Sequence, residues 1–241
     1  YDHGPEQAIS PYAEIPHLPE DLVRRTRATY AALTTMVDRW FGHFLEALRV
    51  GGWLDDTLVI VASDHGHSLH ERSYTGKRGY PSEPEVIDTI LLLRRPRAEA
   101  AGTTCDAWVQ HHDIAGTILD AAGLGAPIHG RSLLDVASGA SSTPAHVVVG
   151  WGPAVTVIDD SWWLNCKVDG RGPLLYGRGA GEGGRGDANL AEDHPEVVRK
   201  MYELAVAEAD GRFPGYLLEE AHSTEDAPGC SPFAAIPLAG S

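Results

Sequence analysis

The chain has 241 residues, 43% of them hydrophobic, which allows one globular domain, or one domain with a small appendage, to bury a sizeable core. Its formal net charge of −15 argues against a surface for nucleic acid or anionic membrane. No apolar run approaches the roughly 18 residues of a membrane span, and no signal peptide opens the sequence. The three cysteines (Cys105, Cys166 and Cys230) are too far apart for a zinc pattern. We therefore expect a cytoplasmic protein with neither nucleic acid nor membrane as partner.

The first half of the chain predicts an α/β layered domain. Residues 1–20 are rich in proline and polar side chains and predict an extended loop. From Leu22 to Val50 apolar residues recur every three to four positions, which predicts a helix that Gly51-Gly52 ends. Three further elements follow: buried strands at 57–62 and 89–93, and a helix at 111–122. This alternation is typical of a largely parallel sheet with flanking helices.

The second half of the chain has a different residue pattern. Short β-type runs separated by turn residues predict a small antiparallel sheet; they lie at 146–151, 154–158, 161–168 and 173–176. A helix is expected from Pro195 to Ala209, with Asp193 as its cap, and the last thirty residues predict a surface tail. We place the domain boundary near residue 140, with an α/β part at 1–140 and a β-rich subdomain at 141–241.

The strand at 57–62 leads into the most informative residues of the chain. An apolar run ends in Asp64 and His65, two good metal ligands, and Gly66 lets the backbone turn away. Three histidine or acidic side chains follow, and then Gly76-Lys77; they are His67, His70 and Glu71. A hard carboxylate oxygen suits calcium, magnesium or manganese, and the adjacent imidazole favours manganese or zinc. The pattern fits either a divalent-metal site at the end of this strand or a strand that simply ends in a polar turn.

Several motifs in one order resemble the C-terminal half of a sulfatase, in the alkaline-phosphatase-like superfamily. They are the helix with Thr35-Met36-Val37-Asp38-Arg39, the segment from Leu54 to Ile60, Ser63-Asp64-His65-Gly66-His67, Leu69-His70-Glu71, Gly76-Lys77, the segment from His112 to Gly123, Gly130-Arg131-Ser132-Leu133 and Asn189-Leu190-Ala191. The resemblance covers about Ala28 to Leu204. It implies an alkaline-phosphatase-like fold and a hydrolase of sulfate esters.

The same resemblance implies roles for individual residues. Asp64 and His65 would be ligands of one divalent cation, with calcium expected and manganese, magnesium or zinc as alternatives. Lys77 would contact the sulfate and the leaving oxygen, where an ammonium stabilises developing negative charge. His67 would line the edge of the substrate pocket, and His70 and Glu71 would help to hold the loop. The expected substrate is a small anionic ester, and a homo-oligomer stays open.

The chain departs from the sulfatase pattern in one important respect. Sulfatases carry a nucleophile in a Cys/Ser-x-Pro-x-Arg motif, with the Cys or Ser oxidised to formylglycine, upstream of everything matched here. Cys230-Ser231-Pro232 has the spacing but lacks the arginine, and a turn is the better interpretation. Asp159-Asp160 is interpreted as a hairpin turn to Ser161-Trp162, and Arg185-Gly186-Asp187 as a chance tripeptide. We therefore expect this chain to be the C-terminal portion of the enzyme, inactive alone.

Three alternatives stay open. The ester could be a phosphodiester or a phosphonate monoester, handled by a hydrolase of the same superfamily. The chain could instead be a non-catalytic binding fragment that retains Asp64 and His65. The spacing of His65, His67 and His70 also resembles dinuclear zinc hydrolases, but the Asp-His pair of those enzymes is replaced here by Ser68-Leu69.

Overall fold

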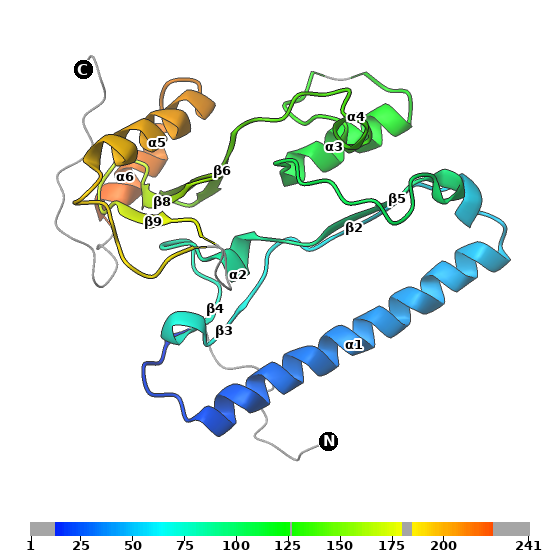
Figure 1. Ribbon diagram of the computed structural model, residues 1–241, viewed down its shortest axis with the longest axis horizontal. Coiled ribbons are helices and arrows are strands. Elements are labelled where there is room, and N and C mark those ends of the chain that lie inside the picture. Colours follow the sequence, from blue (N-terminus) through cyan, green and yellow to red (C-terminus); the bar gives the residue numbers. More distant parts are fainter. Residues whose placement is uncertain (1–12, 126, 180–184, 224–241) are drawn as a thin grey trace. The chain divides into compact units, whose positions relative to one another are not determined.

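The computed structural model describes residues 13–125, 127–179 and 185–223. The chain forms two compact units (Figure 1). Described residues up to 77 join 88–104 in the first unit, and 78–87 join those after 104 in the second. The boundary expected near residue 140 stays a prediction. No helix in the described ranges is both long and apolar enough to cross a membrane.

The first unit begins with the long helix that the sequence predicts. Helix α1 spans Glu20–Val50 and ends at Gly51, whose N–H donates to the carbonyl of Ala47 at 3.0 Å. After η1 (Leu54–Asp56), strand β2 (Val59–Ala62) pairs with β5 (Leu91–Arg94), and η3 (Pro96–Ala98) follows. Helix α1 and the two strands are confirmed as elements.

The expected parallel arrangement is wrong for these two strands. Strands β2 and β5 pair antiparallel, with Val59 opposite Arg94 and Ala62 opposite Leu91. A parallel pair is usually joined by a crossover helix. The connection between them holds instead a hairpin and the four-residue helix α2 (Pro84–Ile87). A buried apolar run has the same composition in either direction, so the sequence pattern could not distinguish the two pairings.

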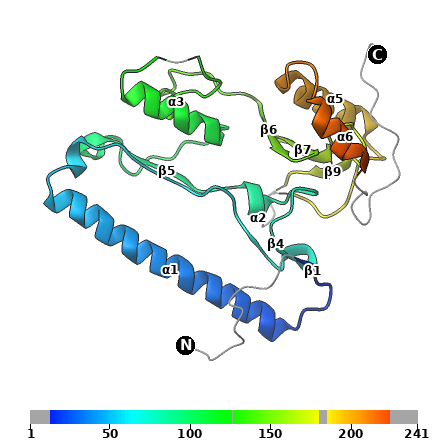
Figure 2. The same ribbon diagram turned by 180° about the vertical axis from the view of Figure 1, so that it is seen from behind.

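The histidine-rich connection is more ordered than expected. Strands β3 (Ser68–Leu69) and β4 (Tyr74–Gly76) form an antiparallel hairpin around η2 (Glu71–Ser73), and β1 (Ala13–Glu14) adds to the other edge of β4. Figure 2 shows β1 and β4 beside the N-terminal end of α1. The connection is therefore tied to the first helix rather than left as an irregular loop.

The second unit contains the predicted antiparallel sheet. Its four strands are consecutive neighbours: β6 (His146–Trp151), β7 (Ala154–Asp159), β8 (Trp162–Lys167) and β9 (Leu174–Gly177). The turn expected at Asp159-Asp160 is confirmed, because one oxygen of Asp159 accepts the N–H groups of Ser161 and Trp162 at 2.8 and 2.7 Å. Successive side chains of a strand point to opposite faces of the sheet, and the continuous burial of β7 and β8 shows that both faces are covered.

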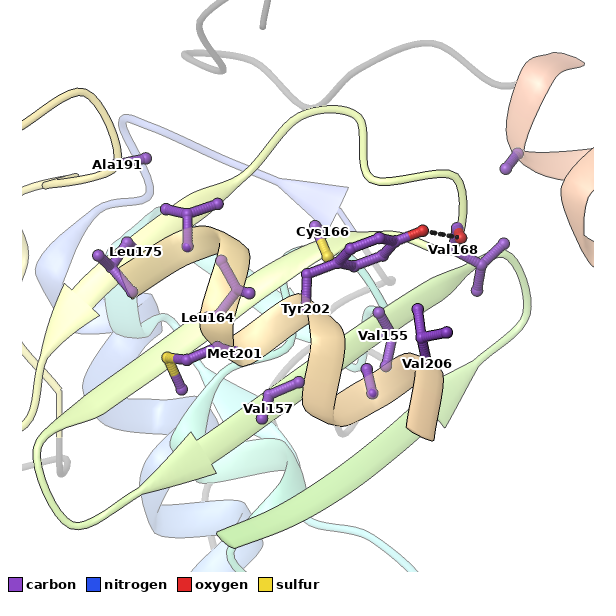
Figure 3. Packing of buried hydrophobic residues seen from close by; sticks show 13 residues of the cluster. Val155, Val157, Leu164, Cys166, Val168, Leu175, Ala191, Met201, Tyr202 and Val206 are labelled. Carbon is purple, nitrogen blue, oxygen red and sulfur yellow. Dashed lines mark hydrogen bonds between the residues drawn. The ribbon is translucent and has the colours of Figure 1, made fainter. Parts of the chain in front are cut away.

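Helix α5 (Pro195–Glu208) and helix α6 (Gly215–Ser223) bury the first face of this sheet. In Figure 3 the ring of Tyr202 lies over the strands, and its hydroxyl donates to the carbonyl of Val168 at 2.8 Å. The buried apolar side chains of this core include Val155, Val157, Leu164, Leu175 and Met201. Two expectations need correction: α5 begins after His194 rather than Asp193, and α6 lies where only a tail was expected.

Residues 78–87, which we call the strap, cover the second face of the sheet. Tyr80 and Ile87 pack against a buried cluster that includes Trp163, and the N–H of Ser82 donates to Asn165 Oδ1 at 2.9 Å. A Cβ atom at Gly79 would collide with the ring of Trp151, so this glycine permits the close approach. The strap therefore packs with strands that begin about sixty residues or more after it in the chain.

The strap also contributes a buried ion cluster. The side chain of Glu83 is 1% exposed, and it accepts hydrogen bonds from Arg185 Nε at 2.8 Å and from Arg78 at 3.1 Å. The Arg185 guanidinium in turn lies 3.7 Å from the ring centroid of Tyr176. The two arginines compensate a carboxylate that would otherwise be buried without a partner.

Helix α3 (His111–Ala121) confirms the predicted helix and packs with the short helix α4 (Leu133–Ser138). The carboxylate of the buried Asp113 accepts the backbone N–H groups of Gln110 and Arg131 at 2.9 and 2.8 Å and lies 3.0 Å from the Arg131 guanidinium. Burial by itself raises the pKa of Asp113, but these donors outweigh it, so the pKa lies below its ordinary value.

Replacing Asp113 by asparagine is expected to lower the free energy of unfolding by about 1–3 kcal/mol at pH 7. A depressed folded pKa stabilises above the unfolded pKa of about 3.9, and this contribution is lost as pH falls through the folded pKa. The variant should therefore lose less stability in acid than the parent chain. Urea unfolding between about pH 3 and pH 7 measures both effects, with the exposed Asp55→Asn as control. An unchanged acid dependence would contradict the assignment.

Candidate active site

The predicted metal ligands stand where β2 ends. Ala62 is the last residue of the strand, and Asp64 and His65 follow within three positions. The Asp64 side chain is 85% exposed, and its Oδ1 accepts the N–H of His65 at 2.9 Å. That hydrogen bond holds the pKa of Asp64 below its usual range, with smaller contributions from the His65 and Lys77 side chains. Asp64 is therefore an ionised, solvent-exposed carboxylate, which is the form that can bind a cation.

The hairpin brings Lys77 to the same place. Ser68 pairs with Gly76, so the residues just before β3 and just after β4 meet at the open end of the hairpin. Lys77 Nζ lies 2.6 Å from His65 Nε2, which is in turn 3.3 Å from Asp64 Oδ2. The structure thus gathers a carboxylate, an imidazole and an ammonium near the end of this strand, and their roles stay predictions.

The ring of His65 is oriented by its own backbone. Its Nδ1 lies 2.8 Å from the carbonyl of Gly66, which can only accept, so Nδ1 carries the proton and Nε2 presents a lone pair. A histidine that ligates a metal usually donates its other N–H in this way, which fixes the tautomer. His65 Nε2 therefore accepts from the Lys77 ammonium at 2.6 Å.

His67 lies beside this group and contacts α1. Its ring stacks on Tyr30, with centroids 6.2 Å apart and an interplanar angle of 25°. Burial lowers the pKa of His67, and the neighbouring His65 and Lys77 side chains lower it further. His67 is thus a neutral, partly buried imidazole next to the candidate site, and its place at a pocket edge stays a prediction.

Glu71 holds the hairpin, as expected, through a residue that the sequence did not single out. The carboxylate of Glu71 accepts the N–H of Leu69 and a bond from Arg27 of α1 at 3.1 Å. Arg27 Nε also donates to the carbonyl of Leu69 at 3.2 Å. No local pattern marks Arg27, because it is one of several arginines on an amphipathic helix and lies 42 residues from its partner.

The tip of the hairpin is strained. His70, Arg72 and Ser73 adopt positive φ angles of 80°, 48° and 60°, although none of them is glycine. Such conformations cost about 1–3 kcal/mol each and persist where the surroundings enforce them. This strained tip lies at the opposite end of the hairpin from His65 and Lys77.

Asp64 and His65 fit a divalent cation as part of its ligand set. A separation of 3.3 Å between Asp64 Oδ2 and His65 Nε2 suits two ligands of one ion, and a bound ion would replace the Lys77 ammonium as the partner of Nε2. No group of three or more His, Cys, Asp or Glu side chains in the described residues could hold a metal ion. This pair would therefore supply part of a metal shell.

The other sequence motifs lie apart from these residues. Cys230-Ser231-Pro232 falls outside the described residues, as do five positions of the glycine-rich segment at 177–186. Arg185, interpreted from the sequence as part of a chance tripeptide, is instead the buried partner of Glu83. Nothing local predicts that pair, since its members are 102 residues apart.

Solved structures with the same fold define the class of protein first. The chain superposes with a TM-score of 0.70 on a phosphonate monoester hydrolase from Silicibacter pomeroyi, at 24% identity and covering 84% of this chain and 44% of the other. It superposes with a TM-score of 0.67 on a structure in complex with its substrate D-glucosamine-2-N,6-O-disulfate, at 23% identity and covering 86% and 45%. The expected alkaline-phosphatase-like fold is confirmed.

Sequence comparison then gives the family. The sulfatase family model matches residues 2–124, about half of the chain, and the chain belongs to the sulfatase family. It is 36% identical over 118 residues to the N-acetylglucosamine-6-O-sulfatase of Bacteroides thetaiotaomicron, a match that covers 48% of this chain and 21% of that protein. The chain therefore spans less than half the length of the relatives it matches.

Proposed function

We propose that this chain is part of a metal-dependent sulfatase that hydrolyses sulfate esters. The observation that carries the proposal is the cluster of Asp64, His65 and Lys77, with Lys77 Nζ 2.6 Å from His65 Nε2. Sulfatase-family membership and the sulfated substrate bound to a structural neighbour support the ester class. The substrate would be a small anionic ester.

The residues of the cluster would divide the work between binding and charge stabilisation. Asp64 and His65 would hold a divalent cation, calcium by family resemblance, and this ion supplies positive charge for the sulfate oxygens. The Lys77 ammonium would donate a hydrogen bond to the leaving ester oxygen as negative charge develops there. His67, neutral and stacked on Tyr30, would line the edge of the pocket.

The nucleophile would come from another part of a longer protein. The sequence contains no Cys/Ser-x-Pro-x-Arg motif, and the chain spans only part of its relatives. Helix α1 also exposes an apolar stripe at a spacing of three and four residues; Tyr30, Leu33, Val37, Trp40 and Phe44 form it. An amphipathic helix buries such a stripe against a core. We propose that the remainder of the sulfatase domain covers it.

The test compares the isolated chain with a longer protein that adds the remainder of the domain. Only the longer protein should turn over 4-nitrophenyl sulfate, and Asp64→Ala should abolish that turnover. Turnover by the purified 241-residue chain, lost in Asp64→Ala, would show that the chain needs no further segment. A longer protein without activity, whose weak divalent-metal binding is nevertheless lost in Asp64→Ala, would support a non-catalytic binding fragment instead.

A second candidate keeps the residues and changes the ester. The phosphonate monoester hydrolase among the structural neighbours has the same fold, and Asp64, His65 and Lys77 would serve a phosphorus-centred anion equally well. Parallel assays of the longer protein with 4-nitrophenyl sulfate and 4-nitrophenyl phenylphosphonate separate the two. A higher kcat/KM for the phosphonate would favour this second candidate.

A further inference from the structure

The separation of His65 and Lys77 depends on the register of one short hairpin. Only two residue pairs connect its strands, Ser68 with Gly76 and Leu69 with Thr75. A slip of this ladder by one residue would turn each side chain to the opposite face. The contact between Lys77 Nζ and His65 Nε2 therefore requires further interactions that fix the register of the hairpin.

Arg27 and Glu71 connect the hairpin to helix α1 at the end of that ladder. The guanidinium of Arg27 donates through Nε to the carbonyl of Leu69 at 3.2 Å and through a terminal nitrogen to Glu71 Oε1 at 3.1 Å. The other oxygen of Glu71 accepts the N–H of Leu69. Both polar backbone groups of Leu69, a ladder residue, are thus held by this pair.

The position of the pair also explains how the tip keeps its conformation. Residues His70, Arg72 and Ser73 have positive φ angles in the segment that begins directly after Leu69. The N–H of His70 donates to the carbonyl of Tyr74 at 2.9 Å, and the N–H of Ile15 donates to Ser73 at 2.7 Å. The strained turn is therefore enclosed between its neighbours in the three-stranded sheet and the Arg27–Glu71 pair.

We propose that Arg27 and Glu71 are positioning residues, which hold the hairpin register that sets Lys77 against His65. The role of Lys77 in turnover rests on the proposed function, whereas its placement by Arg27 does not. The side chains of Arg27 and Glu71 are 52% and 34% exposed, and exposed ion pairs add little to global stability. Their effect is thus local to the hairpin and its open end.

The experiment measures the reactivity of the Lys77 amine in the 241-residue chain. Trace acetylation with acetic anhydride across a pH series, followed by peptide mass spectrometry, gives the labelling rate of Lys77 relative to the exposed Lys200 of α5. Arg27→Ala and Glu71→Gln should each raise that ratio by about threefold or more, since Lys77 loses a hydrogen bond to His65. The matched control is Arg24→Ala, one turn earlier on the exposed side of α1, which should leave the ratio unchanged.

Circular dichroism establishes that each variant keeps its helices, so that labelling reports the hairpin alone. An unchanged Lys77 ratio in both folded variants would overturn the proposal, as would an equal rise in Arg24→Ala. The labelling needs no substrate. The two proposals can therefore fail separately. If the longer protein does not hydrolyse sulfate esters but Arg27→Ala still raises the labelling of Lys77, the proposed function is rejected and the positioning role is retained.

Discussion

Replacing Glu83 by alanine is expected to lower the free energy of unfolding by about 3–5 kcal/mol. The substitution leaves Arg185, whose side chain is 3% exposed, without its carboxylate partner. It also removes the bond from Arg78, which anchors the start of the strap. A buried guanidinium with no compensating anion is the dominant penalty. Urea unfolding of the chain, followed by tryptophan fluorescence, measures the change.

Two other substitutions distinguish the effect of burial on stability from the effect of charge. Glu83→Gln keeps the shape and one acceptor oxygen, so its loss of stability should be smaller than that of Glu83→Ala but still above about 1 kcal/mol. Glu99→Ala removes an exposed carboxylate 3.9 Å from Arg97 and should change stability by less than about 0.5 kcal/mol. Equal effects of Glu83→Ala and Glu99→Ala would show that the buried cluster has no special importance.

Replacing Lys77 by alanine is expected to lower kcat of the longer, active protein by about 10²- to 10³-fold. The ammonium would act on charge that develops on the leaving oxygen, so the loss should fall on kcat more than on KM. Steady-state hydrolysis of 4-nitrophenyl sulfate measures both constants. The loss should shrink with esters whose leaving groups are more acidic, because these need less stabilisation.

Lys77→Arg keeps the positive charge and tests whether the shape of the group that carries it matters. A guanidinium is planar and delocalised, so it should not restore the full rate. Lys200→Ala, on the exposed surface of α5, is the matched control and should leave kcat unchanged. A Lys77→Ala protein within about threefold of the parent kcat would remove Lys77 from the chemistry, since a lost charged donor is normally worth far more than that.

Most of the helices and strands could be predicted from local patterns in the sequence. The apolar period of α1, its glycine stop, and the four strands separated by turn residues are all confirmed, because each depends on residues within a few positions. Strand direction and strand neighbours depend on the whole domain, and here the parallel expectation for β2 and β5 was wrong. Helix α6 escaped notice because its nine residues follow Pro214 and begin with glycine.

The residues of the candidate site show the same division between local patterns and contacts distant in the sequence. Asp64 and His65 could be proposed from the end of a predicted strand, and Lys77 from the resemblance to sulfatases. Arg27 and Tyr30 could not be proposed, since they reach the loop from a helix about forty residues earlier. No local pattern marked Glu83. Its burial becomes visible only when Arg185, 102 residues later, is seen against it.

The path of the strap has a consequence for inheritance. Residues 78–87 lie in the chain between two stretches of the first unit, yet their side chains complete the core of the second. A single crossover between the strap and the C-terminal sheet separates the sheet from Glu83 and Tyr80. A recombinant joined at residues 104 and 105 would combine the strap of one parent with the sheet of another. Residues of the strap and of the sheet are therefore expected to co-vary.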